Sequence, residues 1–264
     1  MEDTQIEKND VENILANYKG NLLFSEALER VNHTDLVKII NKYVHFNCFF
    51  GAGVANLASQ FACQKDLFRD KDESLLYGDR SMEVGACIFS AAIDEFGDRG
   101  IESKPTHRLL AQAFLKGLNN YYNINYLEFH INEEISKKVK DGYGIEIPYS
   151  ENQLFKSLGF HIGSELLADK EFRTLDEKLR KNHPELVNYL KITNVEISGQ
   201  KMPAYYWVKI HTGVEIEHFE YAVRGAGLAF KYYSGSKIDA KNNILEGINS
   251  FATFQEDFMK TLLD

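Results

Sequence analysis

The segment His211-Thr-Gly-Val-Glu215-Ile-Glu-His218 carries three side chains that can bind a metal, at helical spacing. At 100° per residue, these three positions fall within roughly 60° of arc on one helix face. Buried imidazoles and carboxylates cost free energy unless they are paired or ligated, so an ordinary core face has little reason to carry all three. The stripe predicts a metal site on a helix. The alternative interpretation is a partly exposed row of His–Glu surface pairs. Further candidate ligands elsewhere in the chain would favour the metal site over the surface pairs.

The rest of the chain favours helices in a single domain. Its 264 residues are 44% hydrophobic and 26% charged, as in globular proteins, and no repeat or composition shift divides them. Only four prolines interrupt the chain, at positions 105, 148, 184 and 203, which leaves long stretches free to form helices. We therefore predict an all-α fold over residues 1–264.

Composition argues against several classes of partner. Acidic residues outnumber basic ones by 39 to 30, giving a net charge of −9, so we expect no nucleic-acid backbone as a ligand. The first ten residues contain no basic and apolar leader pattern, and residues 48–63 are too short and polar for a bilayer span. Cys48, Cys63 and Cys87 are odd in number and lie among apolar neighbours, which suggests reduced thiols. We expect a cytoplasmic protein.

Periodic apolar residues locate the elements. One long buried helix is expected over residues 35–65, kinked at its glycines. Charged residues 174–189 should be helical, and residues 194–203 should form a loop or small hairpin. Further helices are expected over residues 77–96, 105–119, 127–140, 151–172 and 240–263.

Three more candidate ligands lie inside apolar helical segments. Glu95 closes the run of small residues from Val84 to Ala92, and His107 lies at the start of the next helix. Glu165 follows Gly159 and Gly163, which permit a neighbouring helix to approach closely. His161 precedes Glu165 by one turn and is expected to orient it, or to bond a carbonyl, rather than bind metal directly. Helical bundles use inward-pointing acids and histidines from several helices in this way.

These motifs resemble one family. Asp94-Glu-Phe-Gly97 followed by His107-Arg-Leu-Leu is similar to the Asp-Glu-x-Gly and His-x-x-Leu stretch of the haem-oxygenase-like di-iron oxidases. Gly163-Ser-Glu165 resembles the middle-helix glutamate of that family, and the 211/215/218 stripe resembles its His-x3-Asp-x2-His helix. That group includes CADD-type proteins, a fatty-acid decarboxylase and several N-oxygenases. The resemblance covers roughly residues 35–233.

The chain departs from the family pattern at two places. Glu215 is one methylene longer than the usual Asp, which puts full occupancy by two irons in doubt. The interval from Glu165 to His211 is longer than is typical, so residues 173–203 are expected to hold an insertion that covers the site or builds a dimer contact.

The resemblance implies a haem-oxygenase-like bundle of about seven to nine helices and a homodimer. It implies two Fe(II) ions, for which Mn is the alternative metal, and O2 as a co-substrate. It is also compatible with an external electron donor. The implied substrate is a small amino-acid-like, amine or fatty-acid molecule. The implied ligands are Glu95, His107, Glu165, His211, Glu215 and His218, the three glutamates also being the implied catalytic residues.

A substrate pocket is expected against the aromatic inner faces. Arg224, two turns after His218, is the candidate partner for a substrate carboxylate, although a surface ion pair is the more ordinary role. Candidate pocket walls are Phe46, Phe49, Phe50, Tyr206, Trp207 and Tyr221, each of which suits plain core as well.

Two other functions are also compatible with the sequence. A metal-free TenA-like hydrolase would use a cysteine nucleophile, Cys87 or Cys63, beside a pocket carboxylate. A helical interaction protein without catalysis would bind a partner on its surface. Haem binding is disfavoured, since one proximal His would leave the other ligands unexplained.

Overall fold

The computed structural model describes residues 5–29, 31–68, 80–93, 95–97, 105–124 and 133–263. The described residues are mostly helical, which confirms the predicted all-α class, and they form more helices than the seven to nine expected. None of the described helices is long and apolar enough to cross a bilayer. The elements are α1 (Lys8–Leu15), α2 (Gly20–Ala27), α3 (His33–Phe46), η1 (Asn47–Phe49), α4 (Phe50–Cys63), η2 (Lys65–Phe68), α5 (Arg80–Ser90), α6 (His107–Tyr122), α7 (Glu133–Gly142), α8 (Glu151–Asn182), α9 (Pro184–Ile192), β1 (Asn194–Ile197), β2 (Gln200–Pro203), α10 (Tyr206–Tyr232) and α11 (Lys237–Lys260).

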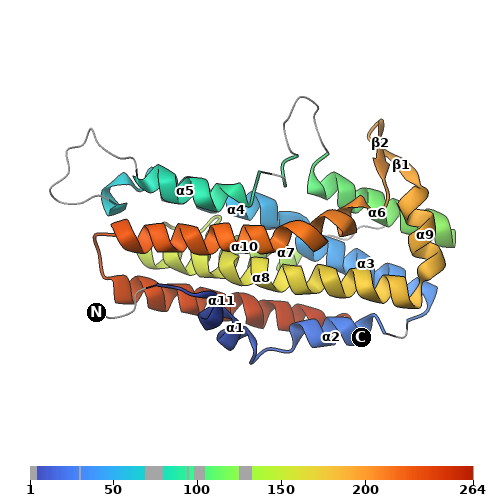
Figure 1. Ribbon diagram of the computed structural model, residues 1–264, viewed down its shortest axis with the longest axis horizontal. Helices are drawn as coiled ribbons and strands as arrows, with labels where there is room; N and C mark the ends of the chain where they lie inside the picture. Colours follow the sequence, from blue (N-terminus) through green and yellow to red (C-terminus); the bar gives the residue numbers. More distant parts are fainter. Residues whose placement is uncertain are drawn as a thin grey trace.

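Three long helices form the centre of the molecule. Helix α8 lies between α10 and α11, and all three run nearly side by side (Figure 1). The contact between α8 and α11 depends on glycine, because a Cβ on Gly159 would lie 1.9 Å from the Ile244 carbonyl oxygen. A Cβ on Gly247 would lie equally close to the carbonyl oxygen of Lys156. The prediction that Gly159 admits a close neighbour is therefore confirmed.

The long helix predicted over residues 35–65 is two helices. Helices α3 and α4 are separated by the short 3-10 segment η1, and the break precedes the glycines at which a kink was expected. Asn47 Nδ2 donates to the Tyr43 carbonyl at 2.9 Å, and the Cys48 thiol contacts the Val44 carbonyl at 3.3 Å. These side chains compete with the backbone ladder, which favours a break there.

The helix predicted over residues 77–96 is also shorter than expected within the described residues. Helix α5 ends at Ser90, and the next backbone bonds join Ala91 to Ile88 and Ala92 to Phe89. Such bonds between residues three apart belong to tighter turns than an α-helix makes. Glu95 therefore lies in a turn after α5, and the prediction that it closes a helix is wrong.

The second half of the chain follows the prediction more closely. The helix expected over residues 151–172 continues to Asn182, α9 follows, and the predicted hairpin forms from β1 and β2. Ser198 and Gly199 form its turn with positive φ angles of 50° and 79°. Residues 173–203 thus lie at one end of the bundle, where the hairpin contacts α6 (Figure 1). The last predicted helix, over residues 240–263, corresponds to α11.

Candidate metal centre

The six predicted ligand residues converge in the interior from four parts of the chain. His211, Glu215 and His218 come from one face of α10, and Glu165 comes from α8. His107 is the first residue of α6, which Thr106 caps by accepting a bond from the Leu109 amide. Glu95 comes from the turn after α5, held by a bond from the His107 amide to its carbonyl at 3.2 Å.

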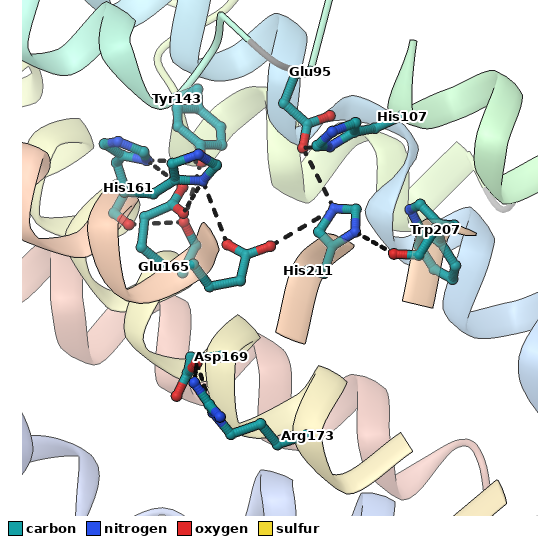
Figure 2. A network of polar contacts seen from close by, with 12 residues as sticks. Glu95, His107, Tyr143, His161, Glu165, Asp169, Arg173, Trp207 and His211 are labelled. Carbon is teal, nitrogen blue, oxygen red and sulfur yellow. Dashed lines mark hydrogen bonds and ion pairs between the residues drawn. The ribbon is translucent and has the colours of Figure 1, made fainter. Parts of the chain in front are cut away.

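The first group consists of Glu95, His107 and His211. Glu95 Oε1 lies 2.9 Å from His107 Nδ1 and 3.7 Å from His211 Nε2. Figure 2 shows these three side chains pointing toward one another. The two imidazole rings also pack edge to face, with centroids 4.5 Å apart. One donor atom from each residue lies within 4.8 Å of the others, a spacing that a single metal ion can draw together.

The second group consists of Glu165, Glu215 and His218. His218 Nδ1 lies 3.5 Å from Glu165 Oε2 and 3.6 Å from Glu215 Oε2. This group meets the same 4.8 Å spacing, and each of its residues is at most 8% exposed. It is therefore a second candidate site, deeper than the first, whose Glu95 side chain is 25% exposed.

Glu215 spans the two groups. Its Oε1 faces His211 Nε2 of the first group at 3.6 Å, while its Oε2 faces His218 of the second. A single carboxylate that presents one oxygen to each group is placed to bridge two metal ions. This geometry makes Glu215 the candidate bridging residue.

The three glutamates have different electrostatic surroundings. Burial would raise the pKa of Glu95, but the contacts with His107 and His211 outweigh it and hold this pKa at about 2. Burial is likewise outweighed at Glu165, where His161 and His218 lower the pKa. Burial dominates at Glu215 and raises its pKa to about 7, with a further contribution from the nearby charge of Glu165. The contacts with Glu95 and Glu215 outweigh burial at His211 and raise its pKa.

A second layer of side chains orients the ligands. His211 Nδ1 lies 2.7 Å from the Trp207 carbonyl oxygen, which can only accept, so Nδ1 donates and Nε2 is left to face the glutamates. His161 Nδ1 lies 3.1 Å from Glu165 Oε1, the place expected for an orienting residue. Tyr143 was not predicted; its hydroxyl lies 3.4 Å from His161 Nδ1 and 3.2 Å from Ser164 Oγ. The only hint in the sequence was a tyrosine inside a glycine-rich turn.

A cavity of about 250 Å³ lies against all six residues. Of the six predicted aromatic walls, Phe46, Phe50 and Trp207 line it. Cys48 also lines it, and burial raises the pKa of this thiol.

Two charged residues, Arg224 and Glu171, differ from the sequence prediction. Arg224 is exposed on α10 near Cys87 and does not line the cavity, so it is not placed to meet a substrate carboxylate there. Glu171, which was not predicted, lines the cavity and is 1% exposed.

The residues present suit a pair of divalent metals. Three imidazoles and three carboxylates form a mixed nitrogen and oxygen donor set, which accepts Fe(II), Mn(II) or Zn(II). The bond from His211 Nδ1 to a backbone carbonyl is the outer contact that metal-binding histidines commonly make. Glu165 and Glu215 are buried and Glu95 is partly buried, so these three carboxylates are also costly to keep together without a cation.

No protein-family model matches this chain, and a search of curated proteins finds no significant match.

Proposed function

We propose that this protein is an O2-dependent oxidase or oxygenase that holds two non-haem ferrous ions between α6, α8, α10 and Glu95. The observation that carries the proposal is the position of Glu215, one oxygen of which faces each of two buried three-residue groups. The sequence resemblance to haem-oxygenase-like di-iron oxidases supports the same assignment, and we propose that fold and a small organic substrate with it.

Bound ferrous ions would supply electrons for the reduction of O2. The residues of the chain would hold and orient the metal ligands. Glu215 holds the two sites in register, and the Trp207 carbonyl fixes the His211 ring so that Nε2 points inward. His161 and Tyr143 hold Glu165 from the outside of the site. Insertion of one oxygen atom into a C–H bond consumes one O2, two electrons and two protons and releases one water, and we propose an external donor for those electrons.

The cavity supplies a place for the substrate beside the ligands. Phe172 stacks on the His211 ring, with centroids 4.1 Å apart, and Trp207 adds a second apolar surface. Such walls exclude water from the reacting end of a substrate, which protects a reactive intermediate from side reactions.

A cysteine-dependent hydrolase fits the cavity less well. Neither Cys63 nor Cys87 lines it; Cys63 is exposed and borders a different pocket, which Gly144 and residues 147–150 also line. Cys48 does line the cavity, but a raised pKa disfavours the thiolate that such a nucleophile needs.

Anaerobic titration of the metal-free protein with Fe(II), followed by Mössbauer spectroscopy and an O2 pulse, tests the proposal. We expect two Fe(II) per chain and rapid oxidation of both by O2. The variant His218→Ala should lose at least one of these ions, whereas His33→Ala, an exposed histidine on α3, should keep both. Binding of one ion or none by the unmodified protein, or iron that O2 oxidises no faster than free Fe(II), would overturn it. An interaction protein would keep its partner binding in His218→Ala.

A further inference from the structure

The buried acid Glu171 has no part in the candidate metal centre. It lies on α8 and lines the same cavity as the six ligand residues, with 1% of its surface exposed. Glu171 lies six positions after Glu165, which corresponds to about 9 Å along the helix axis. The cavity therefore has a carboxylate at some distance from the proposed metals.

The contacts of Glu171 come from neutral donors. Tyr43 Oη donates to its Oε2 at 2.8 Å, and Gln255 Nε2 donates to its Oε1 at 2.7 Å. Gln255 is fixed in turn by a bond from the same nitrogen to Asn21 Oδ1 at 2.7 Å. Two donors aimed at the two oxygens favour the ionised carboxylate. Each oxygen keeps lone pairs for another donor.

Within the described part of the chain, no ion pair gives Glu171 a counter-charge. Among the described residues, its hydrogen-bond partners carry no positive charge. Arg108 also lines the cavity, but it is exposed, donates to the Cys48 carbonyl and lies over the Phe49 ring at 5.4 Å. A buried carboxylate without a cation is costly, and a ligand that brings a positive charge removes that cost.

We propose that Glu171 anchors the ammonium group of a small primary amine, whose uncharged end then lies at the metal ligands. The cavity suits a hydrocarbon chain, since the apolar residues Phe172, Trp207 and Ala168 also line it. An alkylamine has a pKa near that of lysine, so it is charged at neutral pH. The inference rests on the proposed function only where it says that the uncharged end of the amine reacts, because binding of the ammonium group at Glu171 requires no metal.

Calorimetric titration with hexylamine, hexan-1-ol and hexanoate tests the anchor directly. These probes share a six-carbon chain and differ in the charge of the head group. We expect hexylammonium to bind the unmodified protein at pH 8 at least tenfold more tightly than hexan-1-ol, and hexanoate to bind no better than the alcohol. Equal binding of hexanoate and hexylammonium to the unmodified protein would overturn the proposal without any variant.

Two variants locate the site. Glu171→Gln keeps the shape of the side chain and one acceptor oxygen for Gln255 Nε2, while the Tyr43 hydroxyl can accept from the new amide nitrogen. It should weaken hexylammonium binding at least tenfold while leaving hexan-1-ol binding unchanged. Glu246→Gln removes the same charge from the surface of α11, where it pairs with Lys156, and should leave both probes unchanged. Equal hexylammonium affinity in Glu171→Gln and Glu246→Gln would contradict the anchor.

The same titrations separate this inference from the proposed function. Unmodified protein that binds two Fe(II) but no hexylamine would overturn the amine site alone. Protein that binds hexylamine through Glu171 but holds no metal would leave the amine site standing and overturn the oxidase.

Discussion

Glu215 belongs to the second group of ligands and also faces His211 of the first, so its substitution should affect both proposed metals. Glu215→Gln keeps the length of the side chain but replaces a bridging carboxylate with a neutral amide. We expect metal content, measured by elemental analysis after Mn(II) or anaerobic Fe(II) loading, to fall from two ions per chain to one or fewer. Glu220→Gln removes an exposed charge from the same helix and should retain two. Two ions in Glu215→Gln would exclude the bridging role.

Glu171 should make the stability of the metal-free protein depend on pH. Burial raises its pKa from the ordinary 4.5 to about 7, despite the bonds from Gln255 and Tyr43 that lower it. The folded chain then retains a proton that the unfolded chain has released, so the free energy of unfolding falls as pH rises from about 4.5 to about 7. The full effect above that window is roughly 3 kcal/mol. Tyr43, whose own pKa lies well above its usual range, stays protonated throughout.

Urea unfolding of the unmodified protein and of Glu171→Gln at pH 5 and pH 8 measures this effect. Groups other than Glu171 titrate in both proteins, so the difference between the two free energies isolates its contribution. Glu171→Gln should gain stability relative to the unmodified protein at pH 8. A difference in the free energy of unfolding between the two proteins that is the same at pH 5 and pH 8 would show that the pKa of Glu171 is not raised.

Residue patterns predicted the ligands better than the cavity. Positions 211, 215 and 218 share a helix face whatever surrounds them, so their spacing alone identified them. Glu171 was missed because it lies in the charged run Asp169-Lys-Glu171-Phe-Arg, which resembles a solvent-facing stretch. A signal was present, since Glu171 takes one place in a stripe of leucines at four-residue spacing with Leu167, Leu175 and Leu179, all buried.

At the scale of elements, helix α4 leaves room for the Glu95 side chain because position 51 is a glycine. A Cβ on Gly51 would lie 2.8 Å from Glu95 Cβ and 3.1 Å from its Oε2. Gly51→Ala should therefore displace Glu95 and weaken one of the two metals at least tenfold in a Mn(II) titration, while the helical content stays unchanged. Gly213→Ala on α10 is the matched control, because a Cβ there meets nothing within 4 Å. Equal metal affinity in the two variants would mean that Gly51 does not control Glu95.

Elements were predictable where a periodic pattern was long and uninterrupted. Helices α8, α10 and α11 and the hairpin follow from hydrophobic spacing and from the Ser198-Gly199 turn. The ends of helices near the site were not predictable, because they depend on tertiary contacts. Glu95 sits in a turn fixed partly by the His107 amide, twelve residues away in sequence. The break at η1 depends on side-chain bonds that a pattern of apolar residues does not encode.

At the scale of the whole molecule, the candidate site joins four segments that are far apart in sequence. Glu95, α6, α8 and α10 contribute donors, so metal bound between them cross-links the folded state and is lost on unfolding. A ligand at one hundred times its dissociation constant stabilises a fold by about 2.7 kcal/mol. In a chain of this size each kcal/mol moves Tm by about 2–4 °C, so saturation should raise it by about 5–10 °C.

Thermal unfolding followed by circular dichroism, with and without Mn(II) and after EDTA, measures that cross-link. The unmodified protein should lose the gain in Tm when the chelator removes the metal. Metal bound at the protein surface would raise the Tm of the unmodified protein and of Glu215→Gln equally, whereas metal held between the four segments should raise the Tm of Glu215→Gln by less. A Tm that saturating metal does not move in the unmodified protein would mean that the six side chains meet for reasons of packing and charge alone, since any ion bound among them must favour the folded chain.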